Sequence, residues 1–361
     1  MHLTVSEEIP KNWNTYITSA KNEAGFYQSE LWAHVKNKQD QSQPLFIEVD
    51  DSSNIVLTLL LFQKTPSNKI NIKPATRFNN LISGDYRGWL EWIDGPVLHT
   101  QQFDLAFAAL NCLFKWLDVY SMKHKLIRIR SDGFNHLSKW NSDTRIRSLF
   151  EKFKYSTSTW GTYLVDLTQD EDTLFGNIHQ KARGKVRKAS QLSLSIRQPE
   201  NVDDYLKNWQ DVYVASGIKQ PLPPDIIEIM LEDKTRKFIY HYLVNDKKKR
   251  NLAVVSMYVF NKMARRVMSS ISPVCRDERI PAQDLITWHC LLEAKKLGCH
   301  TFDFAGVNPN PQTSKEQGIK DFKSKWGGTY HEFYISEKNN YSVFYKGLTK
   351  LWQLKQRMLS N

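Results

Sequence analysis

The stretch AQDLITWHCLLEAKKLGCHTFDF, residues 282–304, decides the fold. Its first part is a mostly apolar run that predicts a helix over 282–297. Gly298 follows directly, and glycine often ends helices because it adopts the left-handed backbone readily. Residues 301–304 then predict a strand. A helix that leads straight into a strand indicates a sheet with a helix crossing behind it.

The same order of elements occurs twice along the chain. In the second half, the helix at 282–297 is preceded by an antiparallel hairpin, expected from 238–244 and 252–260 around the polar turn NDKKKR. In the first half, the corresponding segments are a hairpin at 45–49 and 55–62, a helix at 103–120 and a strand at 126–130. We therefore expect two α/β domains with mixed sheets, covering residues 1–155 and 156–361, because 153–159 has the polarity of a loop.

Further elements are expected in the second domain. They are a strand at 163–166, a helix over about 170–190, a helix from Ile226 after a proline-rich break, and a basic amphipathic helix over 345–358. That last helix either packs against the domain or makes peripheral contact with an anionic membrane.

Composition restricts the class of protein. The 361 residues include 50 Lys and Arg against 38 Asp and Glu, for a net charge of +12. Such a balance fits a polyanionic partner, and solubility charge is the alternative. The N-terminus lacks a secretory pattern, and the longest apolar run, 55–62, is too short to span a bilayer. Four cysteines without paired spacing suggest free thiols. We expect a cytoplasmic monomer.

Common catalytic signatures are missing. The sequence has no GxGxxG, P-loop or GxSxG motif, which disfavours dinucleotide binding, P-loop chemistry and α/β-hydrolase chemistry. Its His-Cys pairs, at 289–290 and 299–300, are adjacent and lack the spacing of metal ligands. We therefore expect neither a metal nor a bound cofactor.

Three segments carry the candidate chemistry. In HQKARGKVRKA, residues 179–189, Arg183 and Arg187 lie four residues apart on one helix face, which favours phosphate binding over a solvated basic face. Asp303 begins DFAG at the end of a strand, in either a binding crevice or a surface loop. In GIKDFKSKWGG, residues 318–328, a lysine beside an aromatic residue either stabilises an oxyanion or is simply solvated.

Four motifs, in order, resemble those of the FemABX family of peptidyl aminoacyltransferases, which belong to the GNAT-like acyltransferases. They are FYQSELWAHVK at 26–36, WIDGPV at 92–97, RGKVRKA at 183–189, and FDFAG at 302–306 with FKSKWGG at 322–328. The resemblance covers most of the chain. It implies two tandem GNAT-like domains without a coiled-coil arm. It also implies transfer of an amino acid from aminoacyl-tRNA to an amine, which in the best-known members belongs to a peptidoglycan-precursor stem peptide.

The resemblance also implies roles for individual residues. Lys323 would stabilise charge on the aminoacyl ester, with Phe322 packing beside it, and Lys36 would bind a phosphate-bearing acceptor. Other residues expected to bind substrate are Gln28, Trp32, Arg183, Arg187, Lys219, Arg279 and Asp303.

Two departures from the family pattern concern the acceptor. Ala215 and Ser216 stand where an arginine is frequent, so Lys219 is its candidate substitute. The strand RRVM, residues 265–268, lacks the tyrosine often found there. These differences count against a nucleotide-linked muramyl acceptor more than against the fold.

Two other functions remain open. One is an acyl-CoA-dependent N-acyltransferase acting on an amino sugar, lipid or small metabolite. The segment that would cradle its pyrophosphate, CRDERIPAQ at 275–283, has no glycine and contains a proline, although Arg276 and Arg279 offer phosphate-binding side chains. The other is a binding module without catalysis, and Lys323 beside Phe322 argues against it.

Overall fold

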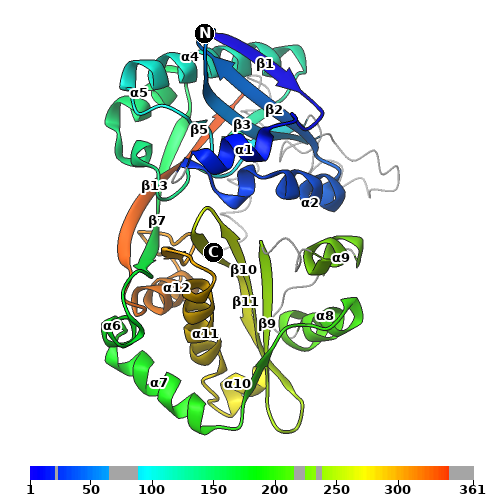
Figure 1. The fold of residues 1–361 in the computed structure, drawn as a ribbon, viewed down its shortest axis with the longest axis vertical. Coiled ribbons are helices and arrows are strands. Elements are labelled where there is room, and N and C mark those ends of the chain that lie inside the picture. Colours follow the sequence, from blue (N-terminus) through cyan, green and yellow to red (C-terminus); the bar gives the residue numbers. More distant parts are fainter. Residues whose placement is uncertain (21–22, 65–87, 215–223, 233–237, 341–361) are drawn as a thin grey trace, which may run out of the picture. The chain divides into compact units, whose positions relative to one another are not determined.

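The computed structural model describes residues 1–20, 23–64, 88–214, 224–232 and 238–340 (Figure 1). The chain divides into two compact units. Unit 1 contains Met1–Ser158 together with the described residues from Phe333 onward, and unit 2 contains Thr159–Glu332. The first division lies near the predicted boundary after residue 155. The return of the chain to unit 1 after Glu332 has no counterpart in the predicted domains.

Unit 1 is a mixed sheet with helices packed on it. In spatial order its strands are β1 (His2–Ser6), β2 (Gln43–Asp50), β3 (Ile55–Lys64), β4 (Trp89–Trp92), β6 (Arg128–Ser131) and the end of β13 (Thr329–Asn339), while β5 (Val97–Leu98) pairs with β3. The pair β4 and β6 is parallel, and α4 (Phe103–Lys123) forms the crossover between them. The other helical segments are α1 (Trp13–Ser19), η2 (Phe26–Gln28), α2 (Glu30–Asp40), η3 (Lys139–Ser142) and α5 (Thr144–Lys152).

The strands of unit 2 also run in mixed directions. In spatial order its strands are β7 (Ser156–Asp166), β12 (Thr301–Asp303), β11 (Met263–Ile271), β10 (Asn251–Phe260), β9 (Ile239–Asn245) and β8 (Ser195–Arg197). The pair β11 and β12 is parallel, with α11 (Ala282–Lys296) between them in the chain. The remaining helices are α6 (Glu171–Asn177), α7 (Gln180–Gln191), α8 (Val202–Asn208), the π-helix η4 (Trp209–Tyr213), α9 (Pro224–Glu232), α10 (Pro273–Asp277) and α12 (Ser314–Ser324).

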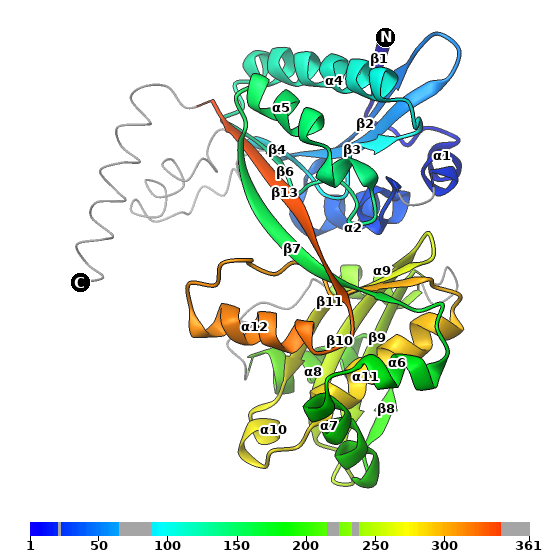
Figure 2. The same ribbon diagram turned by 90° about the vertical axis from the view of Figure 1, so that its left-hand side faces the viewer.

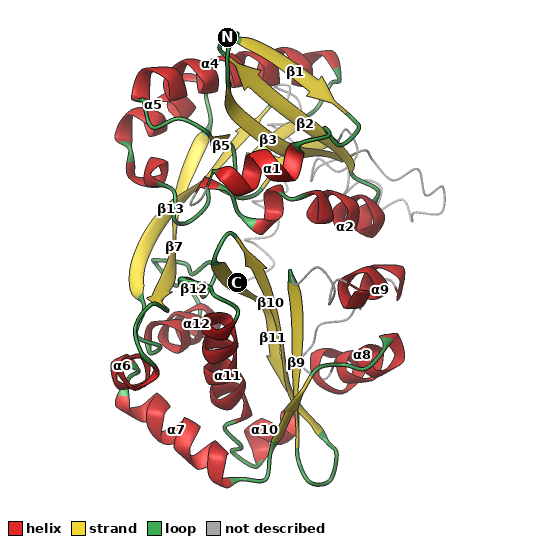
Figure 3. Ribbon diagram, in the orientation of Figure 1, coloured by secondary structure: helices red, strands yellow, loops and turns green. Residues whose placement is uncertain are grey.

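The central sheet of unit 2 is covered on both faces. Figures 1 and 3 show α11 on one side of β9, β10 and β11, with α8 and α9 on the other. One core combines α7 and α11 with inward-facing strand residues, and a smaller core combines η4 and α9 with Leu243 and Val254. Because side chains alternate along β10, Val254 and Val255 belong to different cores. Two covered faces explain why this strand is apolar along most of its length.

The repeat predicted from the sequence is present. In each unit, three antiparallel strands are followed by a helix and a strand parallel to the third: β2, β3, β4, α4 and β6 in unit 1, and β9, β10, β11, α11 and β12 in unit 2. The tandem mixed α/β fold predicted from these segments is therefore confirmed. The four residues of β4 are too few to show a period, and the sequence does not predict this strand.

One predicted helix is two helices. The sequence predicts a helix over about 170–190, but the chain turns at Ile178 between α6 and α7, where its ψ of 137° is extended. His179 then caps α7 by accepting a hydrogen bond from the amide of Lys181. The predicted helix at 345–358 lies outside the described residues. Within the described part of the chain, no helix has the length and apolar character needed to cross a membrane.

Candidate active site

Helix α12 carries the two residues expected to act on substrate. A capping box sets its start: Thr313 accepts from the amide of Glu316, and the Glu316 side chain accepts from the amide of Thr313. Phe322 and Lys323 lie in its last turn. Figure 2 shows α12 in unit 2, and in the chain it follows β12. The capping box thus fixes the register in which the helix presents both side chains.

Lys323 points back to the end of β12. Its Nζ donates hydrogen bonds to the carbonyl oxygens of Gly306, at 2.8 Å, and Ala305, at 3.2 Å. Burial, reinforced by the positive charge of Arg266, lowers the pKa of Lys323 to about 8. At neutral pH most molecules therefore carry a charged ammonium in a largely desolvated place. Such a group interacts strongly with a developing negative charge.

Asp303 holds in place the loop whose carbonyl groups accept hydrogen bonds from Lys323. The Asp303 carboxylate is fully buried and accepts from Nε of Arg265 at 2.6 Å, from Oγ1 of Thr162 at 2.6 Å and from the amide of Ala305 at 2.8 Å. Ala305 has a φ of 59°, a conformation that costs energy in a residue with a Cβ. The contacts of Asp303 and Thr162 hold that conformation, so Asp303 positions the carbonyl groups that orient Lys323.

Phe322 is anchored in a line of aromatic rings. It contacts Trp326 edge-on at 6.0 Å, Trp326 stacks on Phe304 at 6.2 Å, and Phe304 contacts Phe302 at 5.0 Å. Phe302 lies in β12, Phe304 directly follows this strand, and both are buried. The line of rings therefore packs the end of α12 against the sheet. This packing fixes the position of Lys323, the residue after Phe322.

Two cations lie over the Phe322 ring. Nζ of Lys325 is 4.4 Å from the ring centre, and Cζ of Arg266 is 5.0 Å from it. Lys325 also forms a 2.6 Å ion pair with the buried carboxylate of Asp284, in the first turn of α11.

We call these groups the Phe322 cluster: Arg265, Arg266, Asp284, Asp303, Phe322, Lys323 and Lys325. Its four cations meet two carboxylates, which gives a net charge of +2. A desolvated cluster with excess positive charge is suited to an anionic substrate or intermediate.

The Gly-Gly turn lets the chain pass close to α6. Gly327 has a φ of +78°, and a Cβ there would lie 3.0 Å from the backbone oxygen of Asn177. Just before it, the carbonyl oxygen of Lys325 accepts a 2.8 Å hydrogen bond from the amide of His179. The end of α12 is thereby joined to the start of α7.

The basic helix α7 is partly occupied by structural contacts. Nη1 of Arg183 donates to the carbonyl oxygens of Gly176 and Ile178, which closes the end of α6. The guanidinium of Arg187 lies 5.3 Å from the Phe175 ring centre and remains exposed. Three further cations on this helix are exposed: Lys181, Lys185 and Lys188. An exposed cationic face is present on α7, and Arg183 has a second, structural role.

In unit 1, Gln28 is fully buried. Its Nε2 donates to the carbonyl oxygens of Ile93, at 2.7 Å, and Leu60, at 3.2 Å, while its Oε1 accepts from the amide of Leu60 at 2.7 Å. These bonds tie the segment before α2 to β3. Trp32 is half-buried and packs edge-on against Tyr27 at 4.9 Å.

Lys36 belongs to a four-membered ion network in unit 1. Its Nζ lies 2.8 Å from Asp40 and 3.4 Å from Glu91, and Lys64 contacts the same two carboxylates at 2.8 and 3.0 Å. The two positive and two negative charges balance. A phosphate that bound Lys36 would therefore compete with Asp40 and Glu91.

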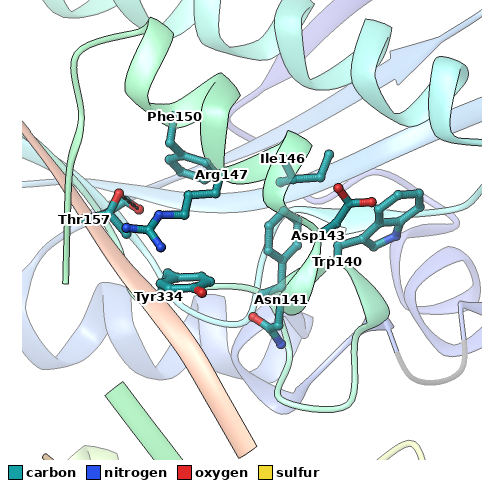
Figure 4. Close-up of a pocket in the computed structure, with 11 residues that line it drawn as sticks. Trp140, Asn141, Asp143, Ile146, Arg147, Phe150, Thr157 and Tyr334 are labelled. Atoms are coloured by element: carbon teal, nitrogen blue, oxygen red, sulfur yellow. Dashed lines mark hydrogen bonds between the residues drawn. The ribbon is translucent and has the colours of Figure 1, made fainter. Parts of the chain in front are cut away.

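The other predicted residues lie elsewhere. Arg279 is exposed in the turn between α10 and α11, and Lys219 falls outside the described residues. A small pocket in unit 1 is lined by residues of η3, α5, β7 and β13, with Arg147 5.1 Å from the Tyr334 ring centre (Figure 4). None of the predicted site residues lines it. In the described part of the chain, no group of His, Cys, Asp or Glu has the arrangement of a metal site.

Sequence reasoning missed Arg266, Thr162 and the Lys325–Asp284 pair as parts of the site. One signal was available for Arg266: in MARRVM, residues 263–268, two consecutive arginines interrupt an apolar strand. Since successive side chains face opposite sides of a sheet, at least one arginine had to face a covered side. The pairing of Lys325 with Asp284 joins residues 41 positions apart, and no local pattern indicates it.

Comparison with known proteins establishes the fold. No protein-family profile and no curated protein sequence matches this chain. Among solved structures, FemX is 13% identical, with a TM-score of 0.67 over 93% of this chain and 97% of FemX. A tandem GNAT protein from the clavulanic acid biosynthesis pathway is 10% identical, with a TM-score of 0.56 over 95% and 100%. L-PGS from Bacillus licheniformis is 13% identical, with a TM-score of 0.53 over 96% and 97%. The chain therefore has the tandem GNAT-like fold of FemX, as its FemABX-like motifs predicted.

Proposed function

We propose that this protein is an acyltransferase that moves an amino acid from aminoacyl-tRNA to an amine acceptor. The observation that carries the proposal is the Phe322 cluster, with a desolvated, charged Lys323 held by two carbonyl groups. A tetrahedral ammonium that donates two hydrogen bonds retains a third N–H bond for substrate. An acyl oxygen placed on that third bond would be stabilised as it gains negative charge.

The reaction needs no general base from the protein. The neutral amine of the acceptor attacks the carbonyl carbon of the ester, a C–N bond forms, and the oxyanion accepts from Lys323. The C–O bond to the ribose then breaks, and the proton lost by the amine ends on the ribose hydroxyl. A net charge of +2 nearby favours the neutral form of an approaching amine. The two carboxylates of the cluster, Asp284 and Asp303, already hold cations.

The basic face of α7 supports a donor made of nucleic acid. Its exposed lysines, Lys181, Lys185 and Lys188, share one side of the helix. The amide of its N-cap residue, His179, donates to the carbonyl oxygen of Lys325 at the end of α12. Phosphate contacts of this kind bind without reading sequence and weaken with added salt. A tRNA donor also places the reaction in the cytoplasm.

The start of α11 counts against acyl-CoA as the donor. A pyrophosphate bound there would need free amides at the helix N-terminus. Pro281 stands at the N-cap, and the buried carboxylate of Asp284 occupies the first turn. Asp284 would repel a pyrophosphate, and its own charge already interacts favourably with the helix dipole.

The acceptor expected from the motifs is the amine of a peptidoglycan-precursor stem peptide that bears a phosphate. The resemblance assigns Lys36 to that phosphate. A phosphate bound there would have to compete with Asp40 and Glu91 for the Lys36 ammonium. If a phosphate binds there, Lys36→Gln should weaken acceptor binding, whereas Lys38→Gln, at an exposed position on the same helix, should not.

The test of the proposal is a choice of donors. Purified protein is given labelled aminoacyl-tRNA or labelled acetyl-CoA, each with the same mixture of cell-wall precursors and amino sugars. We expect label to pass to an amine from the tRNA only, and ribonuclease to abolish the transfer. Transfer from acetyl-CoA alone would assign the alternative, an acyl-CoA-dependent N-acyltransferase.

A further inference from the structure

Arg266 is a buried cation that forms no ion pair with any carboxylate in the described part of the chain. Its side chain, on β11, is only 5% exposed. Its neighbour Arg265 forms a 2.6 Å ion pair with Asp303, whereas no carboxylate among the described residues lies within ion-pair distance of Arg266. Nε and Nη2 of Arg266 are both buried, and neither has a hydrogen-bond partner in the described part of the chain.

An unpaired guanidinium in this place is energetically unfavourable. Burying a charge without a partner strongly destabilises a folded protein. The Phe322 ring, 5.0 Å away, offsets only part of that cost, and the charge of Lys323 adds to it. Burial lowers the pKa of Arg266 to about 10, so the side chain is still charged at neutral pH. The charge balance of the Phe322 cluster is therefore incomplete without an anion.

The two atoms without partners define the shape of that anion. Nε–H and Nη2–H lie on one edge of the guanidinium plane and point in nearly the same direction. Two parallel donors at this spacing match the two oxygens of a carboxylate. A phosphate carries further oxygens that need donors, and a single guanidinium edge does not supply them.

We propose that the Nε–Nη2 edge of Arg266 binds a carboxylate carried by the acceptor substrate, beside Lys323. This inference rests on the proposed aminoacyl transfer. The α-carboxyl of the aminoacyl donor is esterified and cannot supply the group, whereas an amino acid or peptide acceptor carries a free carboxylate. The acceptor class is thus an amine that also bears a carboxylate, such as an amino acid or a peptide end. The carboxylate reduces the charge of the cluster and holds the amine near the ester.

The test measures binding without any donor. L-Lysine and cadaverine have the same chain and terminal amine, but only lysine has a carboxylate. Their binding is measured by calorimetry on wild-type protein, on Arg266→Gln, and on the control Arg145→Gln, an exposed arginine of unit 1. We expect wild type and the control to bind lysine about 10- to 100-fold more tightly than cadaverine, and Arg266→Gln to lose that preference.

Three results would overturn the inference. They are equal binding of the two compounds, no binding of lysine, or a preference that persists in Arg266→Gln. Inorganic phosphate that competes more strongly than propionate would assign the site to phosphate, which also overturns the carboxylate. The binding experiment contains no donor, so its outcome does not depend on aminoacyl transfer. If the protein binds the carboxylate but transfers nothing from tRNA, only the proposed function is rejected.

Thermal unfolding separates ligand binding from a packing role of Arg266. Arg266→Met removes the unpaired charge, so the ligand-free variant should melt at the same temperature as wild type or higher. Sodium propionate should raise the melting temperature of wild type above its value in sodium chloride of equal ionic strength, and should not do so for Arg266→Met. A ligand-free variant that melts well below wild type, with an unchanged response to propionate, would show that Arg266 only packs.

Discussion

The ammonium nitrogen of Lys323 lies 2.8 Å from the carbonyl oxygen of Gly306. This hydrogen bond joins the last turn of α12 to the loop after β12, which Asp303 and Thr162 hold in place. The direction of the remaining N–H bond is therefore fixed by the fold before substrate binds. Preorganisation of this kind is what allows a single donor to stabilise an oxyanion.

The transfer rate should fall as the pH rises above about 8. Burial lowers the pKa of Lys323 to about 8, so a higher pH removes the proton that the oxyanion needs. Lys323→Arg remains protonated throughout this range. We expect the ratio of the wild-type single-turnover rate to that of Lys323→Arg to decline above pH 8, with the ionisation of the acceptor amine cancelling in the ratio. A constant ratio between pH 7 and 10 would contradict this role.

Lys323 should lower stability at neutral pH. Its pKa in the folded protein, about 8, lies below the value of 10.5 expected for the unfolded chain. The cost of burying the charge is therefore fully present below pH 8 and is lost as the pH rises toward 10.5. After allowance for partial exposure, we expect Lys323→Met to raise the free energy of unfolding by about 2 kcal/mol at pH 7. Urea unfolding at pH 7 and pH 10 measures the difference in the free energy of unfolding between Lys323→Met and wild type. An equal difference at both pH values would be inconsistent with a charge effect.

Asp303→Asn should destabilise unit 2 and slow transfer together. The change removes the counter-ion of Arg265 in a fully buried place, for which we expect a loss of about 3 kcal/mol. It also weakens the hold on Ala305, so the carbonyl groups that orient Lys323 become less fixed. Asp321→Asn, on the exposed side of α12, is the control and should change neither quantity by much. Unfolding followed by circular dichroism measures the stability, and the transfer assay measures the rate. Normal stability in Asp303→Asn would refute the structural role of Asp303.

Two glycines of the same motif should respond in opposite ways to alanine. Gly327 has a φ of +78° and lies against the backbone of Asn177, so Gly327→Ala should cost at least 1 kcal/mol and displace the end of α12. Gly318 lies inside α12 with no atom within 4 Å of an added Cβ, so Gly318→Ala should stabilise the helix by up to about 1 kcal/mol. Melting temperatures that shift in the same direction would contradict the assigned geometry.

Much of the fold could be predicted because its strongest signals are local. The apolar run of α11 with Gly298, and the two hairpins, each lie within a few residues of the turns that define them. The break at Ile178 was missed because a single extended residue leaves the helical pattern almost unchanged. For the candidate site, Phe322 and Lys323 were predicted from a motif. Their partners Arg266, Thr162 and Asp284 come from distant segments that meet only in the folded chain.

The most direct test of the central claim is the single-turnover rate of transfer from labelled aminoacyl-tRNA by wild type and Lys323→Met. Lys320→Met is the control, because Lys320 lies on the same helix and its Nζ donates to the carbonyl oxygen of Pro309 instead. If Lys323 stabilises the oxyanion, its replacement should reduce the rate by about 100- to 1,000-fold with the fold intact, whereas Lys320→Met should stay within a few-fold of wild type. A normal rate in a folded Lys323→Met protein would contradict the account.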